Sequence, residues 1–190
     1  MRFKNILFNK VLFLFLISGL ITFLPISTSR AQIRTITGTV TKIIDGDSIQ
    51  ITTQEQTKLK VRLYGIDAPE TDRIDHRTGQ VNKPGQPYGE KSWQALESKI
   101  MGKQVRMVVL DIDKYKRLVG MVWLDDRNID LEMVREGYAE AFIEYLKPPY
   151  RSQFLEAEKE ARSHKRGIWS LLDYERPRDF RKRLKVSSGD

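Results

Sequence analysis

The chain has 190 residues, which predicts one domain long enough to bury a hydrophobic core. It contains no cysteine, which excludes a disulfide, a thiolate nucleophile and a cysteine-ligated zinc site. The formal net charge of +8 is compatible with a polyanionic partner but does not require one, because many solvated protein surfaces are this basic.

The first segment of the chain has the layout of a secretory signal peptide. Basic residues precede an apolar run from Val11 to Leu24, and a polar stretch then ends at Ala31, a small residue suited to a signal peptidase. We therefore expect residues 1–31 to be removed and the protein to be exported, either secreted or periplasmic. An uncleaved membrane anchor is the alternative, because residues 6–25 would nearly span a bilayer.

From residue 34 the sequence reads largely as β-strands. β-Branched residues alternate with polar ones, and Asp45-Gly46-Asp47 and the segment 53–56 interrupt the pattern as turns. A three-stranded meander is the expected result, and two further strands follow after a helix. The five expected strands lie around residues 35–40, 49–51, 59–63, 105–110 and 118–124.

Three helices are expected, each ending at a glycine, over residues 88–101, 131–136 and 152–166. Five strands with inserted and trailing helices predict an α+β, mainly β fold: a five-stranded OB-fold β-barrel with about three helices packed around it. We assign this domain to residues 32–173. The long segment 72–87 is predicted to be a mobile loop, and the basic residues 174–190 a loosely ordered polar tail.

Acidic and basic side chains gather where the expected strands end. Asp47 follows the first strand, and Asp67 and Glu70 follow the third, so the oxygen ligands that calcium prefers can converge from two strand ends. Arg62 lies on the face of the third strand that points away from the core, and Arg117 follows a turn; either guanidinium can clamp a phosphate. The alternative is a plain surface turn, with Arg62 and Glu70 as an ordinary ion pair.

Five blocks of the sequence together resemble the thermonucleases typified by staphylococcal nuclease. The blocks are IDGDS at 44–48, VRLYGIDAPE at 61–70, PYG at 87–89, DKYKR at 113–117 and GIWS at 167–170. They follow the family's order and cover nearly the whole chain after residue 31. The resemblance implies a phosphodiesterase: a calcium-dependent endo- and exonuclease that hydrolyses DNA and RNA to 3′-phosphorylated products.

The resemblance also implies roles for individual residues. Three positions correspond to the family's calcium ligands: the carboxylates of Asp47 and Asp67 and the main-chain oxygen of Ala68. Glu70 corresponds to the general base that acts on water. Arg62 and Arg117 correspond to the two arginines that bind the scissile phosphate and stabilise its developing charge.

Residues around the second arginine resemble the family's substrate contacts. Lys114 and Tyr115 would contact the terminal phosphate and the nucleotide ring, and Tyr145 is a further candidate at the nucleotide. Lys116 stands where the family's type member has glycine. If that position has a positive φ, the turn that places Arg117 is strained.

The expected partner is a nucleic acid substrate, DNA or RNA, with single-stranded or frayed regions favoured. We expect a monomer with no obligate protein partner, and a membrane contact only if the N-terminal segment is not cleaved. A catalytically inactive OB-fold module is the rival hypothesis, because the same barrel can bind single strands by charge and stacking without chemistry. The presence of Glu70, both arginines and both calcium carboxylates argues for the enzyme. A third hypothesis, an exported scaffold that docks on proteins, is supported by no feature of the sequence.

Overall fold

The computed structural model describes residues 34–75 and 77–188. The expected signal peptide and its cleavage point lie outside these residues, so export and cleavage stay predictions. Within the described ranges, no helix combines the length and the apolar character needed to cross a membrane.

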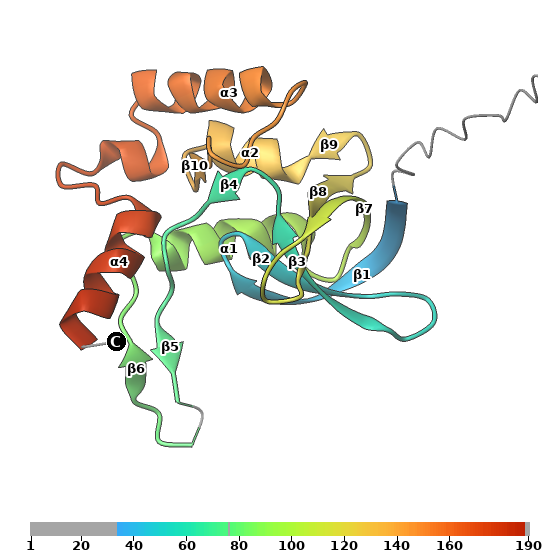
Figure 1. Cartoon of the computed structure of the whole chain (residues 1–190), viewed down its shortest axis with the longest axis horizontal. Coiled ribbons are helices and arrows are strands. Elements are labelled where there is room, and N and C mark those ends of the chain that lie inside the picture. The colour runs from blue at the N-terminus through green and yellow to red at the C-terminus, as the bar shows by residue number, and fades with distance from the viewer. Residues whose placement is uncertain (1–33, 76, 189–190) are drawn as a thin grey trace, which may run out of the picture. The chain divides into compact units, whose positions relative to one another are not determined.

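Five strands form a closed barrel (Figure 1). They are β1 (Arg34–Asp45), β2 (Ser48–Thr52), β3 (Lys58–Leu63), β7 (Gln104–Ile112) and β8 (Leu118–Leu124). Neighbouring strands run antiparallel in the order β3-β2-β1-β7-β8, and a parallel pairing of β3 with β8 closes the barrel. The prediction of a mainly β fold built on a five-stranded OB-fold barrel is confirmed.

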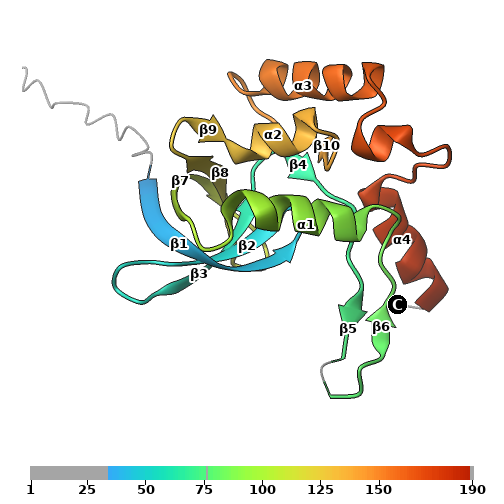
Figure 2. The same cartoon turned by 180° about the vertical axis from the view of Figure 1, so that it is seen from behind.

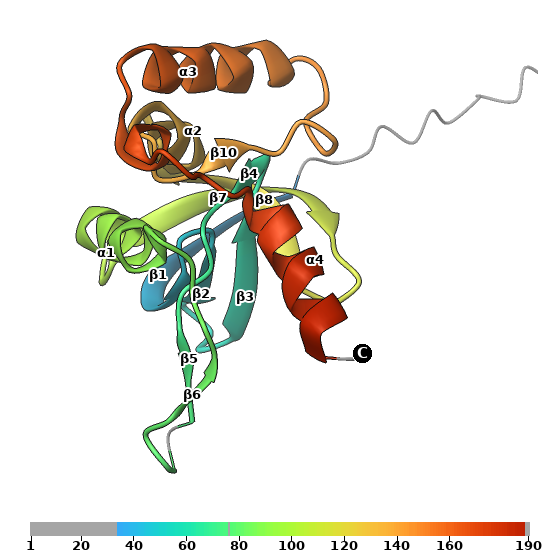
Figure 3. The same cartoon turned by 90° about the vertical axis from the view of Figure 1, so that its left-hand side faces the viewer.

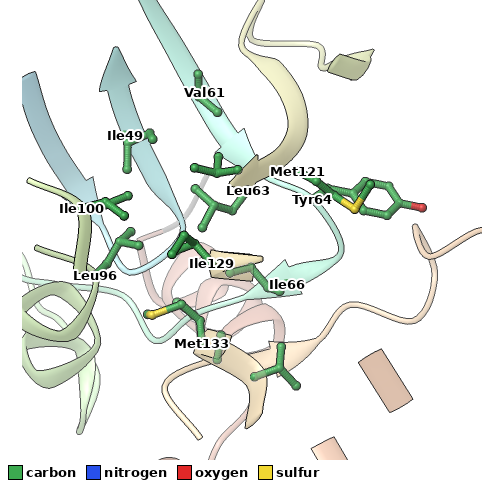
Figure 4. Packing of buried hydrophobic residues seen from close by; sticks show 14 of the residues in the cluster. Ile49, Val61, Leu63, Tyr64, Ile66, Leu96, Ile100, Met121, Ile129 and Met133 are labelled. Carbon is green, nitrogen blue, oxygen red and sulfur yellow. The ribbon is translucent and has the colours of Figure 1, made fainter. Parts of the chain in front are cut away.

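The barrel interior follows from the period of two in the strand sequences. The inward-facing residues of β2 and β3 are Ile49, Ile51, Val61 and Leu63, all almost completely buried. They meet side chains from two helices, among them Leu96 and Met133 (Figure 4). Burial of each large apolar side chain contributes about 1.5–3 kcal/mol. Because alternate residues of a strand point to opposite faces, the core fixes Arg62 on the outer face of β3.

Helices cover the barrel. They are α1 (Gly89–Ile100), α2 (Ile129–Arg135), α3 (Arg151–Ser163), a 3-10 turn η1 (Gly167–Ser170) and α4 (Pro177–Ser188). Helix α1 buries Leu96 and Ile100 against the strands. Asn128 caps the start of helix α2, and its Oδ1 accepts a hydrogen bond from the Leu131 amide at 3.0 Å. Helix α3 packs against α2 (Figure 2).

Short strands complete the structure. Strands β4 (Ile66–Asp67) and β10 (Glu140–Ala141) pair antiparallel, with Asp67 opposite Glu140. Strand β9 (Arg127–Asn128) pairs with β8. The segment 72–87, predicted to be a loop, instead contains a two-stranded ribbon of β5 (Arg73–Ile74) and β6 (Val81–Lys83).

The C-terminal segment corrects a second expectation. Residues 174–190 were predicted to be loosely ordered, but α4 spans most of them, so the described part of the chain has four α-helices rather than three. Pro177 occupies the first helical position, where its missing N–H is not needed. Phe180 and Leu184 are four residues apart, on one side of the helix, and Phe180 is only 5% exposed. Helix α4 and the β5–β6 ribbon extend in the same general direction from the barrel (Figure 3).

Asp130 fastens α2 to the barrel. Its Oδ1 accepts a hydrogen bond from the Tyr64 amide at 2.6 Å and its Oδ2 one from the Val122 amide at 2.8 Å, and the side chain is fully buried. Asp130→Ala would leave two buried N–H groups without their acceptors, each costing about 1–3 kcal/mol. We therefore expect the free energy of unfolding, measured by urea titration, to fall by about 2–5 kcal/mol.

The exposed Asp126, in the turn before α2, provides the matched control. Asp126→Ala should change the free energy of unfolding by less than about 0.5 kcal/mol. Equal losses in the two variants would contradict the anchoring role of Asp130.

Candidate active site

Arg62 links two buried carboxylates. Asp47 lies in the turn between β1 and β2, Asp67 ends β4, and their side chains are 3% and 0% exposed. Nη1 of Arg62 forms an ion pair with Asp47, and Nη2 donates to Oδ1 of Asp67 at 2.9 Å. The β2–β3 register sets Arg62 opposite Ser48, beside Asp47. The structure thus brings together the acids that the sequence placed at two strand ends.

Gly46 allows the turn and the end of β4 to approach closely. A Cβ atom at this position would lie 2.7 Å from Cβ of Ala68 and 2.8 Å from Cβ of Ser92, closer than van der Waals contact permits. In the resulting arrangement the Ala68 amide donates to Oδ2 of Asp47 at 3.0 Å. The glycine of the Asp45-Gly46-Asp47 turn therefore serves the packing that joins the two halves of the site.

The pKa values of the two acids in this turn shift in opposite directions. Burial raises the pKa of Asp45 to about 8, and the neighbouring Asp47 carboxylate adds to this effect. Burial also opposes ionisation of Asp47, but the Arg62 guanidinium and the hydrogen bonds from Asp45 and the Ala68 amide together lower its pKa. Asp47 therefore carries the negative charge that faces Arg62.

Arg117 reaches the same place from the β7–β8 turn. Its Nε donates to Oδ2 of Asp113 at 2.8 Å, and its Nη1 donates to Oγ of Ser48 at 3.3 Å. Ser48 in turn donates to Asp47 at 2.9 Å. Lys116 has a φ of 61°, so the left-handed conformation foreseen for this position is present and is held by a residue other than glycine. Such a conformation costs an L-residue about 1–2 kcal/mol.

Glu70 follows β4 and lies within a close-packed bend. Its amide donates to Oε1 of Gln86 at 3.1 Å, and its carbonyl accepts from the Gln86 amide at 2.8 Å. A Cβ atom at Gly89 would collide with the Glu70 carbonyl. Only glycine at this position therefore allows the start of α1 to lie against the bend. The carboxylate itself accepts from Nη1 of Arg181 at 2.9 Å and from Nζ of Lys83 at 3.5 Å.

The three expected substrate contacts fall in two places. Tyr115 is 66% exposed at the β7–β8 turn, with Nζ of Lys114 5.1 Å and the Arg117 guanidinium 5.6 Å from its ring centroid. Tyr145 is 61% exposed, and its carbonyl accepts a hydrogen bond from Oη of Tyr64 at 3.0 Å. Lys114 and Tyr115 therefore accompany Arg117, whereas Tyr145 is tied to the chain just beyond β3.

Arg181 of α4 is a site residue that the sequence did not reveal. Its Nη2 lies 2.8 Å from Oδ2 of Asp67 and its Nη1 3.0 Å from Oδ1 of the same carboxylate, in addition to the contact with Glu70. Burial alone would lower the pKa of Arg181, but the hydrogen bonds that it donates to Asp67 and Glu70 raise it, so the guanidinium is charged. The basic run at the C-terminus was visible in the sequence, but nothing in it placed one arginine on these two acids.

A second ion pair, with a buried carboxylate and an exposed arginine, lies beside the Asp67 contacts. Glu140 of β10 is 1% exposed and accepts from Nε of Arg176 at 3.0 Å and from its Nη2 at 2.9 Å. Oη of Tyr174 donates to the same carboxylate at 3.3 Å. Because Glu140 stands opposite Asp67 in the β4–β10 pairing, this contact fixes the C-terminal segment against the strand that carries Asp67.

The carboxylate oxygens at the site suit a hard divalent cation. Asp47 and Asp67 present carboxylate oxygens to one shared guanidinium, and oxygen ligands are those that calcium and magnesium prefer. In residues 34–75 and 77–188, no group of three or more histidine, cysteine, aspartate or glutamate side chains is gathered as a metal site. A cation held here would need the two carboxylates together with main-chain or water oxygens, and the chemistry of the two carboxylates fits that requirement.

The fold and the site define a class: a small OB-fold barrel that presents acids and arginines where its strands end. Residues 60–171 match the family described as staphylococcal nuclease homologue. The chain therefore belongs to this family, which supports a nuclease function. The match contains four of the five sequence blocks, and the block at 44–48 precedes it.

Individual relatives agree with this assignment. An uncharacterized endonuclease of Haemophilus influenzae is 32% identical over 148 residues, which cover 78% of this chain and 74% of that protein. A micrococcal nuclease of Shigella flexneri is 33% identical over 157 residues, covering 78% and 82%. A thermonuclease of Staphylococcus intermedius is 32% identical over 147 residues, covering 76% and 83%.

Proposed function

We propose that this protein is a calcium-dependent nuclease that hydrolyses phosphodiester bonds of DNA and RNA and leaves 3′-phosphorylated products. The observation that carries the proposal is the placement of Arg62 between the buried carboxylates of Asp47 and Asp67. A phosphodiesterase needs acids that hold a cation, a base, and guanidinium groups for the phosphate, and all three are within one region. The names of the relatives support the nuclease part of the proposal.

Calcium would be held by the carboxylates of Asp47 and Asp67 and by the main-chain oxygen of Ala68. When bound, it supplies positive charge for the phosphate oxygens and favours ionisation of a nearby water. Ser48 and the Ala68 amide orient the Asp47 carboxylate through the hydrogen bonds at 2.9 and 3.0 Å. This support keeps the ligand carboxylate in one orientation.

The protein residues perform the remaining work. Glu70 accepts a proton from the attacking water, whose oxygen forms a bond to phosphorus as the bond to the 5′-oxygen breaks. The 5′-oxygen leaves as a hydroxyl after taking up a proton, and the phosphate stays on the 3′ side. Arg62 and Arg117 donate hydrogen bonds to the phosphate oxygens as negative charge develops on them. The two guanidinium groups contact neighbouring residues, Arg62 at Asp47 and Arg117 at Ser48, so both are available on the same side of the site.

Exposed aromatic and basic groups at the β7–β8 turn support nucleotide binding. Tyr115 and Lys114 flank Arg117, so a base or ribose stacked on Tyr115 would place its phosphate toward the guanidinium. Tyr145 is a second exposed tyrosine for the same purpose. An exposed stacking residue is sequence-tolerant, which suits a substrate range that includes both DNA and RNA.

We expect the purified protein to cleave a single-stranded DNA oligonucleotide in calcium and to lose this activity in excess chelator. Magnesium should support less cleavage, because it demands tighter octahedral geometry than two carboxylates and a main-chain oxygen provide. Denaturing gels follow the cleavage, and a phosphatase that removes 3′-phosphates identifies the product ends.

Full activity in excess chelator would contradict a metal-dependent mechanism. Tight binding of the oligonucleotide in calcium without any cleavage would instead favour the inactive binding module. A catalytic variant, Glu70→Gln, separates true cleavage by this protein from a contaminating nuclease.

A further inference from the structure

The C-terminal helix places a cationic group on two carboxylates assigned to catalysis. Arg181 of α4 contacts both oxygens of Asp67, at 3.0 and 2.8 Å, and Oε1 of Glu70 at 2.9 Å. Its side chain is 30% exposed, while that of Asp67 is fully buried. One guanidinium therefore bridges the proposed metal ligand and the proposed general base.

The oxygen atoms of the two ligand carboxylates all have hydrogen-bond donors. Asp47 accepts from Arg62 and Ser48 at Oδ1 and from the Ala68 amide at Oδ2. Asp67 accepts from Arg62 and Arg181 at Oδ1, and its Oδ2 accepts from Arg181. A cation that coordinates Asp67 through Oδ2 has to replace Arg181, and the two positive charges repel each other at such short range.

The contact of Arg181 with Glu70 also opposes hydrolysis. The guanidinium takes a position at Oε1 where an attacking water would have to donate its proton. Arg181 thus opposes both the cation and the water that hydrolysis requires.

Several contacts hold α4 in this position. Arg176 forms its paired hydrogen bonds with Glu140, directly opposite Asp67, and Arg178 forms an ion pair with Glu144. Nε2 of Gln86 donates to the Glu175 carbonyl at 3.1 Å, while Oε1 of the same side chain accepts from the Glu70 amide. The approach of Arg181 is therefore part of a connected set of contacts rather than that of an isolated surface side chain.

Helix α4 lies outside the segment of the chain that matches the family. The family match covers residues 60–171, and α4 begins at Pro177. Arg62, by contrast, lies on a barrel strand inside the match and has no contact with Glu70 among the interactions of the described residues. Arg181 therefore lies outside the matched segment, and its guanidinium contacts Asp67 and Glu70 together.

We infer that α4 is an autoinhibitory segment, in which Arg181 competes with calcium for Asp67 and with water for Glu70. The inference rests on the proposed function for the identity of the cation. In the resting form Arg181 occupies the acids, and in the active form it withdraws so that the cation and the water can enter. Calcium concentration would then control the nuclease through the position of one arginine.

The test measures calcium binding to the full chain by isothermal titration calorimetry, without substrate. Arg181→Met keeps the aliphatic part of the side chain and removes its charge, and Arg62 remains to pair with Asp67. We expect this variant to bind calcium at least about fivefold more tightly than wild type, the lower end of ordinary coupling between two binding events. Arg181→Lys, which keeps a positive charge, should fall between the two.

Lys182→Met provides the matched control, because Lys182 is an exposed cation on the same helix. It should leave calcium affinity and cleavage at wild-type values. Cleavage of single-stranded DNA at calcium concentrations below saturation should rise in Arg181→Met and not in the control. Circular dichroism of each variant checks that the fold is retained.

Equal or weaker calcium binding by Arg181→Met than by wild type would overturn the inference. Lower cleavage by this variant at saturating calcium would also overturn it, because Arg181 would then assist the reaction. If wild type and every variant fail to bind calcium or to cleave DNA, the proposed function fails instead. The two failures are therefore distinguishable.

Discussion

Replacing Glu70 by glutamine should slow single-turnover cleavage of a short oligonucleotide by about 10²–10⁴-fold, the usual effect of losing a general base. Glutamine has nearly the shape of glutamate but cannot accept the proton from water at neutral pH. The main-chain hydrogen bonds between Glu70 and Gln86 do not involve the carboxylate, so the bend that carries it should persist. Circular dichroism and urea unfolding should therefore stay close to wild type.

The exposed Glu156 on α3 provides a matched control for the same chemical change. Glu156→Gln should cleave at the wild-type rate. If Glu70→Gln remains folded and cleaves within a fewfold of wild type, Glu70 is not the base, although the protein could still be a nuclease.

The barrel was predictable because its signals are local. Alternation over β2 and β3 and the Asp45-Gly46-Asp47 turn fix which residues face the core, and that leaves Arg62 on the other face. The placement of Asp47 and Asp67 at adjoining strand ends then follows from the barrel topology. Hydrophobic periodicity and turn chemistry were thus sufficient to predict the fold and the approach of Asp47 to Asp67.

The C-terminal helix was not predictable by the same reasoning. Its apolar side consists of few residues, and its high charge resembles that of a solvated tail. What holds it in place is a set of contacts with residues far away in sequence, such as Arg176 with Glu140 and Arg181 with Asp67. A sequence pattern does not show which acid a given arginine will reach, so the contact of Arg181 with the site was missed.

The turn before Arg117 shows a different limit of prediction from sequence. The sequence identified Lys116 as a position where a positive φ would be strained, and the structure has that φ. It also shows what compensates: Asp113 accepts hydrogen bonds from the amides of Tyr115 and Arg117 at 2.9 and 3.0 Å. Each such bond contributes about 0.5–1.5 kcal/mol, which is comparable with the conformational cost.

Replacing Arg62 by alanine should reduce both activity and stability, whereas replacing Arg117 should reduce activity alone. Each change removes one guanidinium that stabilises developing charge, which typically costs about 10²–10³-fold in rate. Arg62 also neutralises the buried Asp47 and Asp67, and breaking a buried pair by removing one partner costs about 3–5 kcal/mol. The partner of Arg117, Asp113, is closer to solvent, and such a pair contributes about 0–1 kcal/mol.

Thermal unfolding with and without calcium, alongside single-turnover cleavage, distinguishes the two roles. Calcium should raise the melting temperature of Arg62→Ala more than that of Arg117→Ala, because the cation supplies positive charge between the carboxylates that Arg62 formerly bridged. The opposite result would have three parts: Arg62→Ala would be as stable as Arg117→Ala, would gain no more stability from calcium, and would cleave within a fewfold of wild type. Arg62 would then neither stabilise the site through Asp47 and Asp67 nor bind the phosphate.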